Sequence, residues 1–536
     1  MRSLAPCAGR CAGLDVAADA SQDGALLRCS PALATRAAPV PDRRVFMKPP
    51  TDAHRALPHQ GSVRGDGIVL GAVLLAVGAA WSATLSPGVR IEFDVGELQA
   101  VCATRGVAHP TGFPIWTLTC SAFAQMFAVG DPAWRANLFT MLSGLAALVP
   151  LFFVLRRLGA TWVLAVAGTV AFAAIPANWR VAVAAEVYQM HLLVMGMTWL
   201  GVVQWHASRN ERWLWSAVCT ACLGIGVHPL MVVTAPGLLL AVLLTDRRAA
   251  MRAVPVGVLA LLLALLPYIW LWTRIQDPDT PFRNVHATDL STFLAYATGA
   301  QFHPVMLTSA PDGALWRETG LQTVTAAGAA AALLLLRARP IRAGMLCAAV
   351  LHALFAVTYG IGELGPYILP VTWLGVVGTV CAAMRIPRLG PLAAGIAVAM
   401  LIANRGAARL EHARQDAQRT EAIAALAPKG VVIVCGWSEL GALWSQQLAT
   451  NAGGPFPIAL CPHDEPEPLR WVAQRLSRPD RLPHQPGSLP PGEPVLFLGE
   501  PWATVSPPLE PIADGIYRSL SPRLRFTAGE ATHTPP

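Results

Sequence analysis

Charged residues are scarce in this chain, and lysine is almost absent. Asp, Glu, Lys and Arg make up 13% of its 536 residues, whereas a soluble domain carries about 25%. The hydrophobic share is 54%, and the formal net charge of +8 is nearly all arginine, since Lys48 and Lys429 are the only lysines. These proportions exclude a soluble globular protein and predict an all-α polytopic membrane protein. The richness in Ala, Gly, Pro and Arg is typical of a GC-rich bacterial genome.

Other patterns are missing as well. No block of basic residues interleaved with aromatics occurs, which excludes a nucleic-acid partner, and no nucleotide-binding glycine loop is visible. Cys219 and Cys222 form a C-x-x-C pair inside an apolar stretch, but no second pair or His gives it zinc spacing, so packing is the simpler interpretation. Residues 1–66 hold no apolar region of a signal peptide. We expect that segment to be disordered, with Met47 as an alternative start to Met1.

About eleven apolar stretches are long enough to cross a bilayer. They lie at 68–87, 136–155, 161–176, 184–206, 213–227, 229–245, 253–273, 321–336, 343–359, 367–384 and 389–404. The stretch 112–129 is apolar but rich in Thr, and it either crosses or lies in the interface.

The arginines decide between these alternatives. If 112–129 does not cross, the arginine pairs and triplets of the short loops fall on one side, with the basic N-terminal segment. Most acidic loop residues then fall on the other side, as the positive-inside rule requires. We therefore predict a cytoplasmic N-terminus and an outer loop over 91–135 that carries juxtamembrane helices. The acids assigned to the outer side are Asp94, Glu97, Glu186, Asp277, Asp279, Asp289, Asp312, Glu318 and Glu363.

The segment 91–114, IEFDVGELQAVCATRGVAHPTGFP, is the strongest candidate for a site. Asp94 and Glu97 are three residues apart and share one face of a helical turn. Carboxylates at the mouth of a membrane helix are costly without a partner or a task. Asp94 is therefore a candidate general base, although Arg90 or Arg105 offers it a structural ion pair instead, and Glu97 is a second candidate.

Further candidates lie on the same outer face. His109, held extended before a proline, either contacts a phosphate or fixes a turn. Arg135 either clamps a phosphate or snorkels to the headgroups, and Arg105 is a further candidate for an anionic ligand. Glu186 and Tyr188 open the fourth span, where a buried acid must face the protein interior. His228-Pro229 is either a site residue or a helical-hairpin corner.

Two other outer segments and the C-terminal region complete the prediction. The loop 275–320 is long enough to be a binding loop or lid, and the corner from Tyr359 to Glu363, with Tyr367, adds an acid and aromatics. Beyond 404 the hydropathy falls: 405–536 reads as a small extracytoplasmic α/β module. Its expected strands are GVVIVCG and VLFLG, with Pro-rich loop over 462–494 and 500–536.

The order of three motifs resembles a bacterial membrane family catalogued as domain of unknown function 2723. The motifs here are Asp94-Val-Gly-Glu97, His109-Pro-Thr-Gly-Phe-Pro114 and Arg135-Ala-Asn137, and the pieces AAEVYQMHLL and DPDTPFRN also resemble that family. The resemblance covers about 68–385, with a weaker match through GVVIVCGWSELGALW. The family's usual second proline after the His is replaced by Thr111. That family is similar to the protein O-mannosyltransferases and other glycosyltransferases of the GT-C superfamily.

The resemblance implies a membrane glycosyltransferase on the extracytoplasmic face of the bacterial inner membrane. A polyprenyl-phosphate sugar, mannose-like, would place its phosphate near Arg135, Arg105 or His109. Asp94 would deprotonate a hydroxyl of a protein or glycan acceptor, and the anomeric centre would invert. No cofactor is required, although the acids leave room for a divalent metal. Glu97 would orient Asp94 or the acceptor.

Two other classes of protein compete with this interpretation. A multipass transporter or flippase of lipid-linked envelope precursors predicts polar residues in the middle of spans and inverted repeats, neither of which is visible. A non-catalytic scaffold for envelope assembly would leave the acid cluster without a task. The sequence therefore favours the transferase.

Overall fold

The computed structural model describes residues 63–277, 280–283, 285, 287–306, 322, 325–359, 365–386, 388–406, 410–426, 432–435 and 437–450, and six further short strands. Of the segment predicted to be disordered, residues 1–62 lie outside the described residues, whereas 63–66 form the first turn of helix α1. The alternative start at Met47 also lies outside them.

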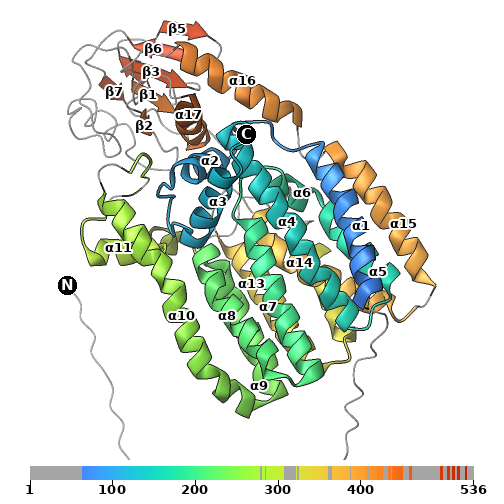
Figure 1. Cartoon of the computed structure of the whole chain (residues 1–536). Coiled ribbons are helices and arrows are strands. Elements are labelled where there is room, and N and C mark those ends of the chain that lie inside the picture. Colours follow the sequence, from blue (N-terminus) through green and yellow to red (C-terminus); the bar gives the residue numbers. More distant parts are fainter. Residues whose placement is uncertain are drawn as a thin grey trace, which may run out of the picture. The chain divides into compact units, whose positions relative to one another are not determined.

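The described membrane region is helical throughout (Figure 1). Its α-helices are α1 (Val63–Ser82), α2 (Val95–Thr104), α3 (Pro114–Met126), α4 (Pro132–Arg157), α5 (Trp162–Ala174), α6 (Pro176–Ala182), α7 (Tyr188–Ser208), α8 (Glu211–Val227), α9 (Leu230–Thr245), α10 (Arg247–Gln276), α11 (Leu290–Ala297), α13 (Arg339–Thr358), α14 (Leu369–Ala383) and α15 (Leu389–Ala403). Short 3₁₀ helices lie between them: η1 (Ala300–Val305), η2 (Ala332–Leu335), η3 (Pro366–Ile368) and η4 (Asn404–Gly406). Two more helices follow, α16 (Leu410–Leu426) and α17 (Trp437–Thr450).

Local sequence explains where several of these helices begin. Asp131 accepts hydrogen bonds from the backbone N–H groups of Ala133 and Trp134 at the start of α4. Asp246 caps α10 in the same way. Short polar side chains at this position satisfy backbone donors that the helix itself cannot pair. The caps therefore fix the helix boundaries on both sides of the membrane region.

The helices pack through small residues and leave an apolar exterior. Helix α4 packs against α7, and α13 packs against α9. At the second contact, a Cβ atom on Gly237 would lie 2.4 Å from the carbonyl oxygen of Gly344, so only glycine permits this approach. On α10, by contrast, Leu259, Leu262 and Leu266 are all more than half exposed. Such a face is stable only against lipid tails or another apolar surface.

Six helical segments among the described residues are long and apolar enough to cross a membrane, or seven if the bent pair α5–α6 counts as one. Every apolar stretch predicted to cross falls on a helical segment, but some of these helices are short or more polar. The polytopic helical fold is therefore confirmed, and the count of eleven stays a prediction. The stretch 112–129 contains α3, a 13-residue helix beside α2, so the predicted pair of helices in the first loop is present.

The C-terminal region contains a five-stranded sheet with the order β2-β1-β3-β6-β5. Strand β1 pairs in parallel with β2 and β3, and β6 is antiparallel to β3 and β5, while β4 and β7 form a separate pair. The strands are β1 (Val432–Cys435), β2 (Ile458–Leu460), β3 (Val495–Leu498), β4 (Thr504–Ser506), β5 (Glu510–Ala513), β6 (Ile516–Ser519) and β7 (Arg525–Thr527).

Strands β1 and β3 coincide with the two predicted strands. The prediction of loop throughout 500–536 was wrong, because β4 to β7 lie there. Each has only three or four residues, which is too short for an alternating pattern to stand out from its turns. The predicted loop 462–494 lies outside the described residues. The division at 404 into a membrane domain and a separate module stays a prediction.

Candidate functional site

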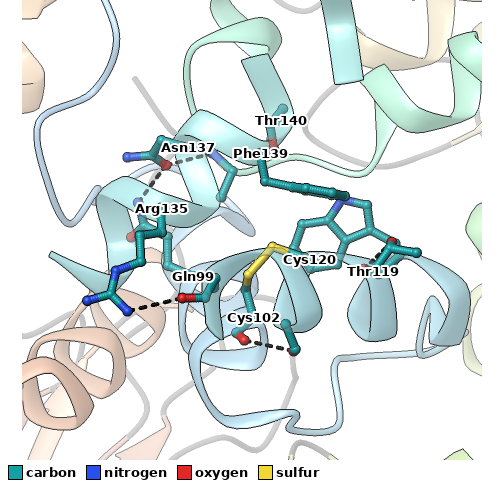
Figure 2. Close-up of a disulfide and its surroundings, with 12 residues drawn as sticks. Gln99, Cys102, Thr119, Cys120, Arg135, Asn137, Phe139 and Thr140 are labelled. Atoms are coloured by element: carbon teal, nitrogen blue, oxygen red, sulfur yellow. Dashed lines mark hydrogen bonds between the residues drawn. A yellow bond between two sulfur atoms is a disulfide. The ribbon is translucent and has the colours of Figure 1, made fainter. Parts of the chain in front are cut away.

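The first loop is held together by a disulfide bond. Cys102 of α2 and Cys120 of α3 are bonded, with their Cα atoms 5.4 Å apart (Figure 2). Beside the bond, the Ser121 hydroxyl donates to the backbone oxygen of Cys102 at 2.7 Å. Sequence reasoning missed this pairing. The signal that was available is that both cysteines lie in the predicted outer loop 91–135.

His109 lies between the two carboxylates of α2. Its Nδ1 is 2.5 Å from Oε2 of Glu97, and its backbone N–H donates to Oε1 of Glu97 at 2.7 Å. Its Nε2 faces Oδ2 of Asp94 at 3.6 Å. Glu97 is fully buried, whereas the side chain of Asp94 is 32% exposed. The structure therefore brings these three candidates together in the order Glu97, His109, Asp94, with Asp94 outermost.

The backbone of the segment explains how residues 12 positions apart can meet. Phe93 and Phe113 have positive φ angles of 36° and 42°, a region that bulky residues rarely adopt and that costs about 1–3 kcal/mol each. Gly112 has φ of 82°, and a Cβ atom there would lie 2.5 Å from the Tyr296 hydroxyl. That hydroxyl donates to the carbonyl oxygen of Ala108 at 2.7 Å. The glycine of the motif is thus required for the turn that presents His109.

The charges around His109 determine its protonation. Burial by itself lowers the pKa of this imidazole, but the carboxylates of Asp94 and Glu97 and the hydrogen bond to Glu97 outweigh it and raise the pKa to about 9. At neutral pH the ring is therefore an imidazolium, whose two N–H groups face two carboxylates.

A cavity of about 550 Å³ opens beside Asp94 and His109. Aromatic rings form much of its wall: Tyr188 packs against His228 with ring centroids 5.1 Å apart, and Tyr367 packs against Tyr188 at 5.5 Å. The cavity continues along the start of α9, where Val232 is 57% exposed. Other parts of the wall come from Gln301, Phe302 and His303 of η1, with Met306, Phe355 and Tyr359.

Tyr188 and His228, two of the predicted substrate-binding residues, line this cavity. Both are buried, and Nδ1 of His228 accepts the backbone N–H of Leu230 at 3.1 Å, which orients the ring at the α8–α9 corner. Glu186 is also buried, but it is not among the lining residues, and its backbone N–H donates to the Thr140 hydroxyl.

The two predicted arginines lie elsewhere in the first loop. Arg135 donates to the backbone oxygens of Ala124, Val129 and Gly130, and so ties the end of α3 to the start of α4. Arg105 ends α2 in a left-handed conformation, and its guanidinium donates to Gln125. Neither lines the cavity, so their role as phosphate ligands stays a prediction.

Sequence reasoning found some of the cavity wall and missed the rest. Tyr359 and Tyr367 belong to the corner singled out from the sequence, and η1 lies in the predicted binding loop. The individual residues of η1 and Phe355 belong to no recognisable motif, whereas Phe113 lies within the His109–Pro114 motif. Glu363, Asp312 and Glu318 lie outside the described residues.

The Asp94–Glu97–His109 cluster also meets the distance requirement for a metal site. One ligand atom from each residue lies within 4.8 Å of the others, the one such cluster found among the described residues. However, each ring nitrogen of His109 already faces a carboxylate. The divalent metal for which the sequence leaves room at these acids therefore stays a prediction.

Residues 94–251 match the family model described as the protein O-mannosyl-transferase TMEM260 N-terminal domain. The protein O-mannosyl-transferase TMEM260 of Mus musculus is 33% identical over 137 residues, or 26% of this chain. The match spans 19% of the length of that relative. The segment 94–251, which matches the family model, begins at Asp94 and contains His109, Tyr188 and His228. The predicted resemblance to O-mannosyltransferase-like proteins is confirmed for this segment.

The fold is similar to that of ArnT from Cupriavidus metallidurans. The structure of ArnT bound to undecaprenyl phosphate matches with a TM-score of 0.54 and 14% identity, over 85% of this chain and 98% of ArnT. The apo structure of ArnT gives a TM-score of 0.48 and 15% identity, over 82% of this chain and 94% of that one. The first match agrees with the predicted helical membrane fold, and membership of the GT-C superfamily stays a prediction.

Proposed function

We propose that this chain is a membrane glycosyltransferase that moves a sugar, mannose-like, from a polyprenyl-phosphate donor to a hydroxyl group of a protein or glycan acceptor. The observation that carries the proposal is the Asp94–His109–Glu97 arrangement at the mouth of an aromatic cavity. It lies in the segment that matches an O-mannosyl-transferase domain. The similarity in fold to ArnT, whose structure was solved with undecaprenyl phosphate, supports a lipid-phosphate donor.

In the proposed reaction, Asp94 accepts the proton of the acceptor hydroxyl. The hydroxyl oxygen attacks the anomeric carbon, the bond from that carbon to the phosphate oxygen breaks, and the configuration inverts. The polyprenyl phosphate leaves with an additional negative charge. Of the three phosphate partners expected from the sequence, His109 is the one beside the cavity, and its imidazolium stabilises this charge. Glu97 acts through His109 as a positioning residue.

The walls of the cavity suit the two parts of such a donor. Aromatic rings such as Tyr188, Tyr367 and Phe113 offer flat apolar faces and polar edges to a sugar ring. The apolar, exposed start of α9 offers a path from the lipid phase for the polyprenyl chain. In this proposal the polyprenyl chain stays in the lipid while its sugar enters the cavity beside Asp94.

We propose that the site faces the extracytoplasmic side of a bacterial inner membrane, with the N-terminus in the cytoplasm and the C-terminal region outside. Two independent features support this orientation. The positive-inside rule assigns the arginine-rich short loops to the cytoplasm and hence the acidic loops to the outside, and the Cys102–Cys120 disulfide fits an oxidising compartment.

The test is sugar transfer in membranes that contain matched amounts of wild-type protein or Asp94→Asn, with radiolabelled polyprenyl-phosphate sugars. Asp131→Asn is the control, because it makes the same chemical change in the same loop and Asn caps a helix as well as Asp does. We expect transfer by the wild type and the control, and loss of transfer by Asp94→Asn. Equal transfer by all three would remove Asp94 as the base. No transfer by any, across several donor sugars, would favour a transporter or a scaffold.

A further inference from the structure

Helix α2 carries Glu97 and directly follows Asp94, and it contacts a helix of the C-terminal region. Helix α17 packs against α2, and Figure 1 shows the two side by side. The contact is made by the two backbones. A Cβ atom added to Gly96 would lie 2.3 Å from the backbone nitrogen of Ala442, and one added to Gly441 would lie 2.5 Å from the backbone nitrogen of Glu97. Neither helix can carry a larger residue at this point without moving.

Glycine is unfavourable inside a helix compared with alanine, because it loses more freedom when the helix forms. The contact nevertheless combines two glycines, Gly96 in the first turn of α2 and Gly441 in the interior of α17. Gly96 directly precedes Glu97 and is two residues after Asp94. The point at which α17 contacts α2 is therefore the turn that presents both carboxylates. The position of α17 therefore fixes how far Glu97 projects toward His109.

Two further contacts tie the same region to the site. Trp444 of α17 packs edge-on against Phe282, with ring centroids 4.6 Å apart. The carbonyl oxygen of Phe282 in turn accepts the backbone N–H of Val107 at 2.9 Å, two residues before His109. The chain that leads to His109 is thus also supported from α17.

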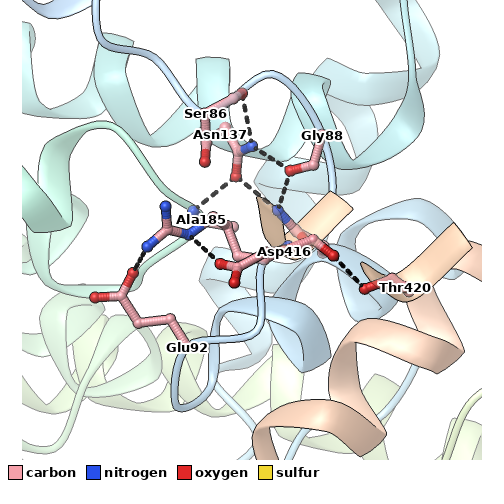
Figure 3. A network of polar contacts seen from close by, with 9 residues as sticks. Ser86, Gly88, Glu92, Asn137, Ala185, Asp416 and Thr420 are labelled. Atoms are coloured by element: carbon pink, nitrogen blue, oxygen red, sulfur yellow. Dashed lines mark hydrogen bonds and ion pairs between the residues drawn. The ribbon is translucent and has the colours of Figure 1, made fainter. Parts of the chain in front are cut away.

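Helix α16 holds the segment that enters α2. Asp416 of α16 lies 3.3 Å from the guanidinium of Arg90 (Figure 3). Arg90 also pairs with Glu92, and its backbone N–H donates to Gln99 of α2. Together, α16 and α17 contact the entry to α2, its first turn and, through Phe282, the segment before His109.

We propose that Gly441 is a positioning residue of the transferase site: through its contact with Gly96, α17 sets the place of α2, so that the C-terminal region is part of the working site. This inference rests on the proposed function, since it concerns the residues of that reaction. It adds a support for α2 that no motif of the first loop contains.

The size of the expected effect follows from the geometry. A methyl group at Gly441 must push the helices apart, because the atoms that it meets belong to the backbone of α2. A displacement of catalytic groups by 1 Å costs roughly 10²-fold in rate. We therefore expect Gly441→Ala to lower kcat by about 10- to 100-fold, with a KM for the donor within a factor of about two, because the aromatic wall of the cavity is on other helices.

The experiment compares full-length wild type, Gly441→Ala and Gly96→Ala in detergent or nanodiscs, with Gly395→Ala as the matched control. Gly395 lies in α15, and a Cβ atom there would meet nothing within 4 Å. Transfer kinetics are measured together with deuterium uptake of the peptide that contains α2. We expect both contact variants to lose kcat and to exchange faster in α2, while the control matches the wild type in both measurements.

The outcomes separate this inference from the proposed function. Unchanged deuterium uptake of α2 in Gly441→Ala would overturn the inference, whether or not the wild type transfers sugar, and so would a wild-type kcat. If the wild type has no transferase activity but the contact variants still expose α2, the proposed function fails and the structural coupling stands, without a role in transfer. If the Gly441→Ala protein does not accumulate in the membrane, Trp444→Ala takes its place in the experiment. That change weakens the contact between α17 and Phe282 without introducing a steric clash. A wild-type kcat in Trp444→Ala then overturns the inference.

Discussion

Replacement of Glu97 by Gln should make sugar transfer sensitive to pH in a range where the wild type is not. Glu97 is fully buried and accepts both the backbone N–H and the ring N–H of His109. A Gln side chain keeps one acceptor oxygen, but its NH₂ group then faces one of these two donors. The Coulomb attraction and one charged hydrogen bond are both lost. Burial, the largest influence on the pKa of His109, is then opposed by Asp94 alone, so this pKa should fall from about 9 to 6.5 or below.

The magnitude follows from the two pKa values. At pH 8 a group with a pKa of about 9 is mostly protonated, whereas one with a pKa of 6.5 is about 3% protonated, a difference of roughly thirty-fold. At pH 6 the two differ by less than about a factor of two. If the imidazolium stabilises the leaving phosphate, Glu97→Gln should therefore lose about twenty-fold more activity relative to wild type at pH 8 than at pH 6.

Stability should change in the same window. Because folding raises the pKa of His109, its contribution to the free energy of unfolding is fully present below pH 6.5 and is lost as pH rises through about 9. By the difference between the two pKa values that contribution is about 3 kcal/mol. The wild type should lose it between pH 6.5 and 9, whereas Glu97→Gln should start from a lower stability and stay flat over this range.

The assay is donor-to-acceptor transfer at saturating substrate from pH 5.5 to 9.5, with thermal unfolding in detergent as the second readout. Glu211→Gln is the control, because it removes a partly exposed carboxylate that pairs with Arg252, and exposed ion pairs contribute about 0–1 kcal/mol. A constant ratio of Glu97→Gln to wild-type activity across the pH range would refute the role assigned to the Glu97–His109 pair.

Four further outcomes are expected. Cys102→Ser or reduction with a thiol should loosen α2 from α3 and lower both transfer and the thermal midpoint, whereas Cys347→Ser, a change at a free and only partly buried cysteine, should do neither. Gly112→Ala should lower the free energy of unfolding by at least about 1–3 kcal/mol in denaturation experiments, because the position combines positive φ with a 2.5 Å clash. Tyr367→Ala should raise KM for the donor more than it lowers kcat in steady-state kinetics, since its ring lies in the cavity wall. A chelator such as EDTA should leave transfer within about a factor of two of its starting rate, because the His109 imidazolium holds the place between the acids; loss of activity that Mn²⁺ or Mg²⁺ restores would contradict this.

The sequence predicted the helical membrane fold and the site segment because both depend on local patterns. Long apolar stretches predict helices, and an acid pair beside one of them marks a site whatever its tertiary contacts are. The pairing of His109 with Glu97 could not be predicted, because it depends on positive φ angles at Phe93 and Phe113. Such conformations are uncommon for phenylalanine and follow from tertiary packing.

The two arginines illustrate the opposite difficulty. A cation at the outer face of a membrane protein is an obvious partner for phosphate, and on that ground the sequence predicts Arg135 and Arg105 as phosphate ligands. In the structure, three backbone carbonyls at the α3–α4 corner engage the guanidinium of Arg135. Backbone acceptors left unpaired at helix ends compete with any ligand for a nearby arginine, and the sequence does not show where these acceptors lie.

The contact between Gly96 and Gly441 also bears on the order in which the protein is made. The acids of the site emerge from the ribosome early, with the first loop, whereas the helix that supports them is synthesised after every helix of the membrane bundle. A nascent chain that has inserted its bundle therefore holds Asp94 and Glu97 without the support of α17. We expect a polypeptide arrested before residue 437 to be inserted and inactive, so that catalysis begins only after α17 has been made.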